Sequence, residues 1–161
     1  MYFIGIFSTK KEYEFIKKEI EKSSNKNINI IHINNKSIEN LCNIKFDAVI
    51  LDKKTDTIEI DIIQKILKDI KYLIINSDIK IKNGILSNIE TNIIDYGLNQ
   101  KSTVTASSIS EENIIICLQR NIKNTNEKII ETNETKISIE NYKNKRIYNI
   151  LIVYILQILY K

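Results

Sequence analysis

The amino-acid sequence predicts an α/β fold in which helices flank a mostly parallel sheet, with an antiparallel β-rich extension and an apolar terminal helix. Over the first 78 residues, short apolar runs alternate with amphipathic segments, a pattern typical of βα units on a parallel sheet. Beyond residue 78, short strand-like segments follow one another with polar connections, which indicates antiparallel pairing. A chain of 161 residues fits one domain, with βα units over 1–78, the extension over 79–142 and the helix over 143–161.

The composition supports a packed core and argues against a nucleic-acid partner. Hydrophobic residues make up 43% of the chain, which is enough for a core. Isoleucine, lysine and asparagine, which have AT-rich codons, together make up half of the residues, so the net charge of +4 is weak evidence for an anionic partner. Arginine occurs only at Arg120 and Arg146, so the chain has few side chains that could bind phosphate or guanine through two hydrogen bonds.

The first half of the chain contains four apolar runs that predict buried parallel strands, over 2–7, 28–33, 46–51 and 72–75. Between the first two, residues 10–22 place Tyr13, Ile16 and Ile20 on one face of a helix and Lys and Glu on the other. Together these segments predict a sheet of the Rossmann-like kind.

Two further helices are expected in this half. Ser37 precedes a short helix that runs through Cys42 and is placed to act as its N-cap. A longer helix is expected over 58–70, with Asp56 or Thr57 as its cap.

The second half predicts shorter strands and a terminal helix. The expected strands cover 93–96, which ends at Gly97, and then 103–108, 114–118, 129–130 and 136–139, with a loop over 121–128. Residues 147–160 are nearly all apolar but fall short of the roughly 20 residues needed to span a bilayer. We expect this helix to be buried, with a membrane surface as the alternative location.

Ligands of open α/β sheets sit beyond the carboxyl ends of the strands, so the residues that follow each strand are the candidate site. These residues are Ser8, Thr9, His32, Asp52, Asn76 and Asp78. Asp52 invites comparison with phospho-receiver domains, but no carboxylate follows the first strand to hold a magnesium ion, so we interpret it as a turn residue. His32 is the only histidine, and we expect it to be hydrogen-bonded at the rim of the sheet rather than catalytic.

Metal and thiol chemistry are also poorly supported. A single histidine and the widely separated Cys42 and Cys117 do not form a zinc pattern. The first residues lack the basic segment and long apolar run of a signal peptide. We therefore expect a cytoplasmic protein with reduced, mostly buried thiols.

Three segments, in the same order along the chain, resemble the central domain of the Mur ligases, which use ATP to join amino acids to peptidoglycan precursors. Residues 73–78 (LIINSD) resemble the strand and Asn-x-Asp-Asp loop of that family. Residues 94–106 (IDYGLNQKSTVTA) resemble its Tyr-Gly stretch, and residues 145–151 (KRIYNIL) resemble the start of its Asn-bearing helix. Residues 4–11 (IGIFSTKK) are similar to the strand that enters the family's phosphate loop.

The resemblance implies a scaffold that has lost its ATP chemistry. Both glycines of the phosphate loop are missing, no Lys-Thr pair follows, and Glu12 stands where it would repel phosphates. The resemblance leaves a remnant pocket with no catalytic residue and no cofactor, formed by Ser8, Thr9, Asn76, Asp78 and Asn149, and residual binding of a nucleotide or UDP-sugar stays open. It implies a non-catalytic binding or regulatory protein, tied to cell-wall or sporulation physiology in a low-GC Gram-positive bacterium.

Two alternatives stay open. One is a small nucleotide-dependent ligase or transferase that holds phosphates in another way. The other is a membrane-peripheral protein that docks through residues 147–160, where the basic residues lie at the ends of the helix rather than along one face. The expected partner is another protein or a second copy of this chain.

Overall fold

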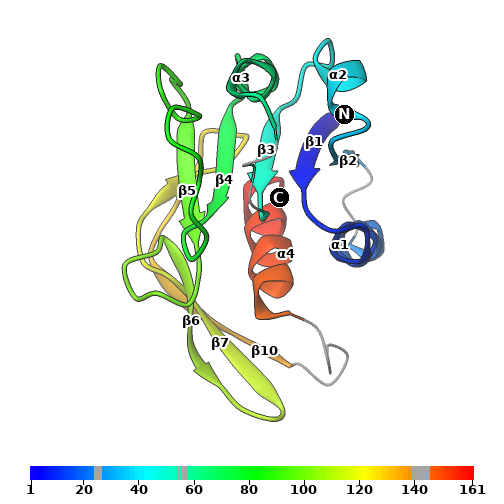
Figure 1. Ribbon diagram of the computed structural model, residues 1–161. Coiled ribbons are helices and arrows are strands. Elements are labelled where there is room, and N and C mark those ends of the chain that lie inside the picture. The colour runs from blue at the N-terminus through cyan, green and yellow to red at the C-terminus, as the bar shows by residue number, and fades with distance from the viewer. Residues whose placement is uncertain (24–26, 54, 56–57, 139–145) are drawn as a thin grey trace. The chain divides into compact units, whose positions relative to one another are not determined.

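The first four strands pair in parallel and form the amino-terminal part of the sheet (Figure 1). The computed structural model describes residues 1–23, 27–53, 55, 58–138 and 146–161. The strands are β1 (Tyr2–Phe7), β2 (Ile28–Ile33), β3 (Ala48–Leu51) and β4 (Tyr72–Asn76). Every residue of β3 and β4 is buried, which explains why both strands are apolar up to Asn76 at the end of β4, since a strand covered on both faces needs no polar alternation.

The remaining strands lie in the second half of the chain. They are β5 (Asn92–Tyr96), β6 (Val104–Ile109), β7 (Asn113–Leu118), β8 (Ile122–Lys123), β9 (Ile129–Ile130) and β10 (Asn133–Ser138). The main sheet has eight strands in the order β10-β7-β6-β5-β4-β3-β1-β2, and β8 and β9 form a separate antiparallel pair. This arrangement confirms the predicted α/β fold with a mostly parallel sheet.

Two expectations about the second half were wrong. The sequence placed β5 in the antiparallel extension, but Tyr96 of β5 pairs in parallel with Val104 of β6, because an apolar run does not reveal the direction of its strand. The stretch 121–128 was expected to be a loop, but it contains β8, because asparagine is a weak turn marker in this composition.

The helices are α1 (Lys10–Lys22), α2 (Ile38–Leu41), α3 (Ile60–Leu67) and α4 (Ile147–Leu159). The bounds of α1 are those predicted, and α4 ends one residue earlier than predicted. Helix α3 is shorter than predicted, because Lys68 has an extended backbone and Asp69 a positive φ of 63°.

The expected helix caps differ in outcome. Ser37 stands before α2 but does not cap it, because its hydroxyl accepts a hydrogen bond from the backbone N–H of Asn34 at 3.1 Å instead. Asp56 and Thr57 lie outside the described residues, and Glu59 occupies the N-cap position of α3 without a side-chain hydrogen bond.

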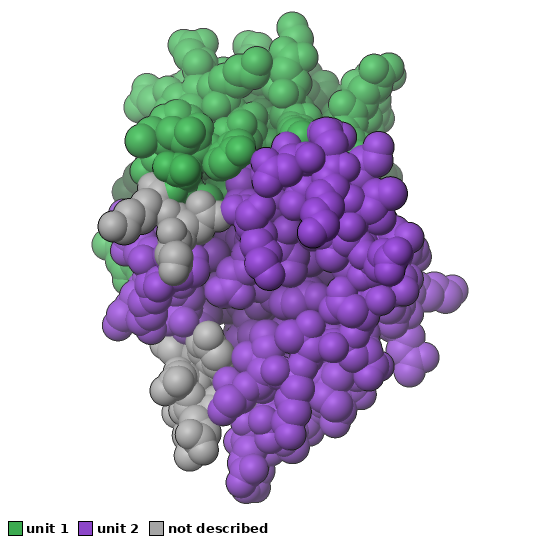
Figure 2. Space-filling model, turned by 180° about the vertical axis from the view of Figure 1, so that it is seen from behind, with its two compact units in different colours: residues 1–14, 27–94 green, residues 15–26, 95–161 purple. Residues whose placement is uncertain are grey.

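The chain divides into two compact units, coloured separately in Figure 2. Unit 1 comprises residues 1–14 and 27–94, and unit 2 comprises residues 15–26 and 95–161. The core of unit 1 is built from the apolar residues of β1–β4 and α3, among them Val49, Leu51 and Leu73.

Helix α4 belongs to the core of unit 2. All residues from Asn149 to Leu156 are buried, and the helix contacts β6. The backbone N–H and the hydroxyl of Thr125 both donate to the carbonyl of Leu159, which fixes the last turn of α4. The helix is therefore buried as predicted, and none of the helices in the described part of the chain is long and apolar enough to cross a membrane.

Candidate functional site

The carboxyl ends of β1, β3 and β4 are level with one another. Phe7 pairs with Leu51, and Leu51 pairs with Ile75. The backbone N–H of Asp52 also donates to the carbonyl of Phe7 at 3.0 Å. The residues that follow these strands therefore meet at one edge of unit 1, where parallel sheets bind their ligands.

The loop after β1 is closed by a capping box at the start of α1. The Glu12 carboxylate accepts hydrogen bonds from the backbone N–H of Thr9 at 3.0 Å and from the Thr9 hydroxyl at 2.9 Å. In return, the backbone N–H of Glu12 donates to the Thr9 hydroxyl at 3.3 Å. The Thr9 carbonyl accepts the first helical hydrogen bond, from Tyr13, so Thr9 is the N-cap and Glu12 is the third helical residue.

This capping box places a negative charge at the amino terminus of α1. A helix amino terminus carries unpaired N–H groups and a partial positive charge, and it is an anion site in many phosphate-binding folds. Here the Glu12 carboxylate is the anion, and only 8% of this residue is exposed. The loop therefore supplies the helix terminus with a negative charge from its own side chain.

Gly5 in β1 is required by packing. A Cβ at this position would lie 2.5 Å from Cδ1 of Ile33 and 3.2 Å from Cε1 of Phe46. The glycine lets β1 approach its neighbours closely, and it does so within the strand rather than in the loop at 8–9. Its presence therefore reflects the core of unit 1.

His32, at the end of β2, helps to hold the same loop. Its Nε2 lies 2.9 Å from the carbonyl oxygen of Ser8. Its ring stacks on Tyr13 of α1, with centroids 5.0 Å apart and planes inclined by 17°. The histidine thus has a hydrogen-bond partner and a stacking partner, as expected for a structural residue at the rim.

The ends of β3 and β4 are joined by a buried polar pair. The side-chain amide of Asn76 donates to Oδ1 of Asp52 at 2.9 Å, and both residues are buried. Oδ1 of Asn76 in turn accepts from the backbone N–H of Asp78 at 3.0 Å. The sequence interpretation of Asp52 as a turn residue missed this pairing, which the predicted adjacency of the two strand ends could have suggested.

The five residues of the predicted remnant pocket fall in two places. Ser8 and Thr9 share the loop after β1, and Asn76 and Asp78 share the turn after β4, all in unit 1. Asn149 lies in unit 2, in the first turn of α4, and is 4% exposed. Its Oδ1 has no hydrogen-bond partner among the described residues.

Unit 1 also has an open groove of about 550 Å³, but it lies away from these residues. It runs along α3 and is closed on the other side by residues 87–90. Its lining mixes lysines and acidic residues with the apolar Leu67 and Ile89, and it contains none of the predicted pocket residues. The groove gives no indication of a particular ligand.

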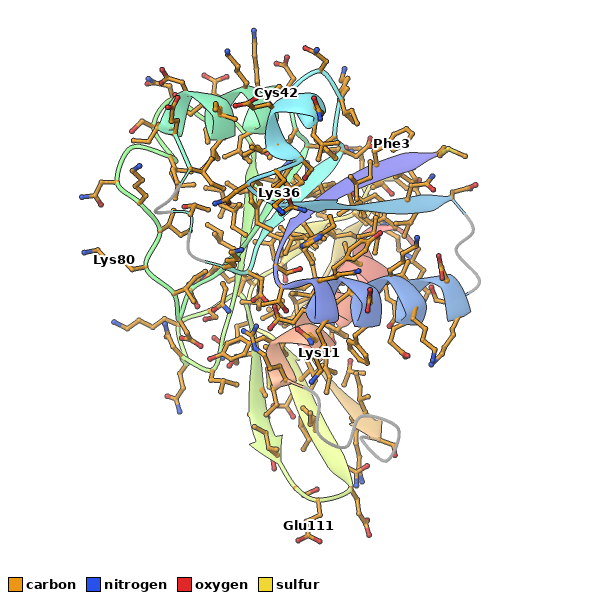
Figure 3. All side chains as sticks on the ribbon, turned by 45° about the vertical axis from the view of Figure 1, so that its right-hand side comes forward. Phe3, Lys11, Lys36, Cys42, Lys80 and Glu111 are labelled. Atoms are coloured by element: carbon orange, nitrogen blue, oxygen red, sulfur yellow. The ribbon has the colours of Figure 1, made fainter. Side chains whose placement is uncertain are left out.

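The remaining groups offer little chemistry. Within the described ranges, no three His, Cys, Asp or Glu side chains are grouped so that they could hold a metal ion. Cys42 and Cys117 are free thiols, the second of them buried. Glu111 and Glu112 are exposed between β6 and β7, and Figure 3 shows Glu111 at the tip of this hairpin.

Comparison with known proteins adds no relative: no protein-family model matches the sequence, and no curated protein matches it.

Proposed function

We propose that this chain is a non-catalytic binding or regulatory protein built on a Mur-ligase-like scaffold whose phosphate-binding loop has been replaced by a self-capped helix. The observation that supports the proposal is the Glu12 carboxylate, which is bonded to Thr9 at the amino terminus of α1. In the family that the sequence resembles, nucleotide phosphates would bind at the corresponding place.

The electrostatic cost of a phosphate at this position is larger than the gain. A helix amino terminus contributes about 0.3–1 kcal/mol to the binding of an anion at an exposed site. A second negative charge about 4 Å from the Glu12 carboxylate would be repelled by about 4 kcal/mol at an effective dielectric constant of about 20. Repulsion therefore exceeds attraction, and the loop excludes ATP.

The polar groups at the strand ends of unit 1 are the proposed remnant of a ligand pocket. The partner of a non-catalytic scaffold is another protein or a wall precursor that is held without being converted. We assign the protein to the cytoplasm and to cell-wall or sporulation physiology on the strength of the resemblance.

The first test is calorimetric titration of the full chain with Mg-ATP, Mg-ADP and UDP-linked peptidoglycan precursors. We expect no heat of ATP binding below millimolar concentration and no release of ADP. Micromolar binding of ATP with turnover would overturn the proposal.

A gain-of-function variant tests the mechanism of exclusion. Glu12→Gln keeps a hydrogen-bond acceptor for Thr9 but removes the charge, and it should give measurable binding of inorganic phosphate or ADP. Glu14→Gln is the matched control, because it makes the same charge change at an exposed position of α1. If both variants bind phosphate no better than the original chain, then the Glu12 carboxylate is not the group that excludes it.

A further inference from the structure

Strand β10 is one of the two edges of the main sheet. It pairs with β7 on one side, from Asn133 opposite Leu118 to Ser138 opposite Asn113, and stands last in the strand order (Figure 1). An edge strand presents backbone N–H and C=O groups to a further strand. No residue of β10 is fully buried, and no strand among the described residues pairs with its outer side.

The two faces of β10 have different environments. The odd-numbered residues face the helix side, because Oδ1 of Asn133 accepts from the hydroxyl of Tyr154 on α4 at 3.1 Å and from the Thr135 hydroxyl at 3.2 Å. The even-numbered residues Glu134 and Lys136 lie on the opposite face and are exposed, and the Glu134 carboxylate accepts a hydrogen bond from the Cys117 thiol of β7 at 3.3 Å. Charges of opposite sign therefore stand two residues apart on one face of an accessible edge.

We propose that β10 is a self-association edge, where the β10 strands of two copies pair in antiparallel fashion around a two-fold axis centred on Thr135. Pairing of two identical antiparallel strands about an axis normal to the sheet places residue 135 opposite itself. The same pairing places Glu134 of each copy opposite Lys136 of the other, twice per dimer. Opposite charges that face each other across strands stabilise the pairing, and like charges weaken it.

The charges select this register over its neighbours. A shift that centres the axis on Lys136 places two lysines opposite each other, and a shift that centres it on Glu134 places two glutamates opposite each other. Strand β2, at the other edge, has the sequence INIIHI and carries no acidic or basic pair that would select a register in this way.

The interface is small. One pair of six-residue strands buries less than the roughly 1,200–2,000 Å² typical of stable specific complexes. The dimer is therefore weak and reversible, with dissociation in the high-micromolar range, and it forms at high local concentration of the chain.

Sedimentation equilibrium over a range of protein concentrations tests the pairing. Glu134→Lys should weaken the dimer about tenfold or more, because each charge pair becomes a pair of lysines. The double variant Glu134→Lys/Lys136→Glu restores opposite charges and should restore the affinity. Glu111→Lys is the control, since it makes the same charge change at the exposed hairpin tip (Figure 3).

Disulfide formation tests the register. In a background of Cys42→Ser and Cys117→Ser, Thr135→Cys should give covalent dimers under mild oxidation, because the two thiols face each other across the axis. Lys136→Cys is more exposed, so random collision would favour it, but the proposed register separates its two thiols. A monomer at every concentration, a dimer insensitive to the charge reversal, or faster cross-linking of Lys136→Cys would each overturn the proposal.

Discussion

Helices α1 and α4 are both 13 residues long, but their amino termini are completed in opposite ways. The Thr9–Glu12 box supplies the start of α1 with hydrogen bonds and a negative charge. The first turn of α4 has no acidic residue and no side-chain cap at Arg146, and the side-chain Oδ1 of Asn149 has no hydrogen-bond partner among the described residues. Local sequence therefore stabilises α1, whereas α4 depends on burial.

The difference has a functional consequence. The Glu12 side chain already neutralises the partial positive charge at the amino terminus of α1, so a negatively charged ligand would gain no attraction there. A buried acceptor without a partner costs about 1–3 kcal/mol, which a donor on a ligand or an ordered water would relieve. The proposed function therefore has α1 exclude an anionic ligand, whereas α4 retains a buried acceptor with no partner among the described residues.

The largest expected effect is in the core around α4. Leu151→Ala should lower the free energy of unfolding by about 2–5 kcal/mol, because the side chain is fully buried and its removal leaves a cavity. Urea denaturation followed by circular dichroism measures the change. Gln157→Ala, at an exposed position of the same helix, should change stability by less than about 0.5 kcal/mol, and equal effects of the two substitutions would contradict the buried placement.

A smaller effect is expected at the cap of α1. Thr9→Ala and Glu12→Ala should each cost about 0.5–2 kcal/mol, because the first removes the side-chain acceptor of the Glu12 backbone N–H and the second that of the Thr9 backbone N–H. The double variant should cost less than the sum, since both residues belong to one box. Additive effects would mean that the two side chains act independently and would weaken the contrast with α4.

At α4, the change at the terminus should have the opposite sign. Asn149→Leu replaces a buried acceptor that has no partner among the described residues with an apolar side chain of similar volume, and it should be neutral or stabilise the protein by about 1 kcal/mol. Thermal unfolding measured by calorimetry gives the sign. A loss of 2 kcal/mol or more would indicate that Asn149 is held by an ordered water.

The smallest effect is expected on the exposed surface of α1. Lys10 and Glu14 form a pair with 3.8 Å between Nζ and Oε1, and both side chains are mostly exposed. Lys10→Ala should change the unfolding free energy by less than about 0.5 kcal/mol, because solvent screens such pairs. A larger loss in the same urea assay would show that charge, and not the cap alone, stabilises α1.

The parts that could be predicted from the sequence are those set by local periodicity. The bounds of β1, α1 and β2 agree with the prediction because the two strands are rich in apolar residues and the apolar residues of α1 recur at helical spacing. The end of α3 could not be predicted, because the break at Lys68 and Asp69 uses neither glycine nor proline in a chain poor in both. The direction in which strands pair could not be predicted from the local sequence either, as the parallel pairing of β5 with β6 shows.

Only part of the candidate site could be predicted from the sequence. The spacing of Thr9 and Glu12 fits a capping box, and the sequence already placed Glu12 where it would oppose phosphate. The bond between Asp52 and Asn76 depends on two strands that are 24 residues apart, so no local signal marks it. The location of Asn149 in a different unit from the other four pocket residues required the structure.

The most direct test of the central claim is hydrogen exchange of the backbone amides in residues 8–13, measured with and without Mg-ATP. If the Glu12 carboxylate fills the amino terminus of α1, the exchange rates should be the same in both conditions. Magnesium-dependent protection of these amides at micromolar ATP would show that the loop binds nucleotide phosphates and would contradict the account.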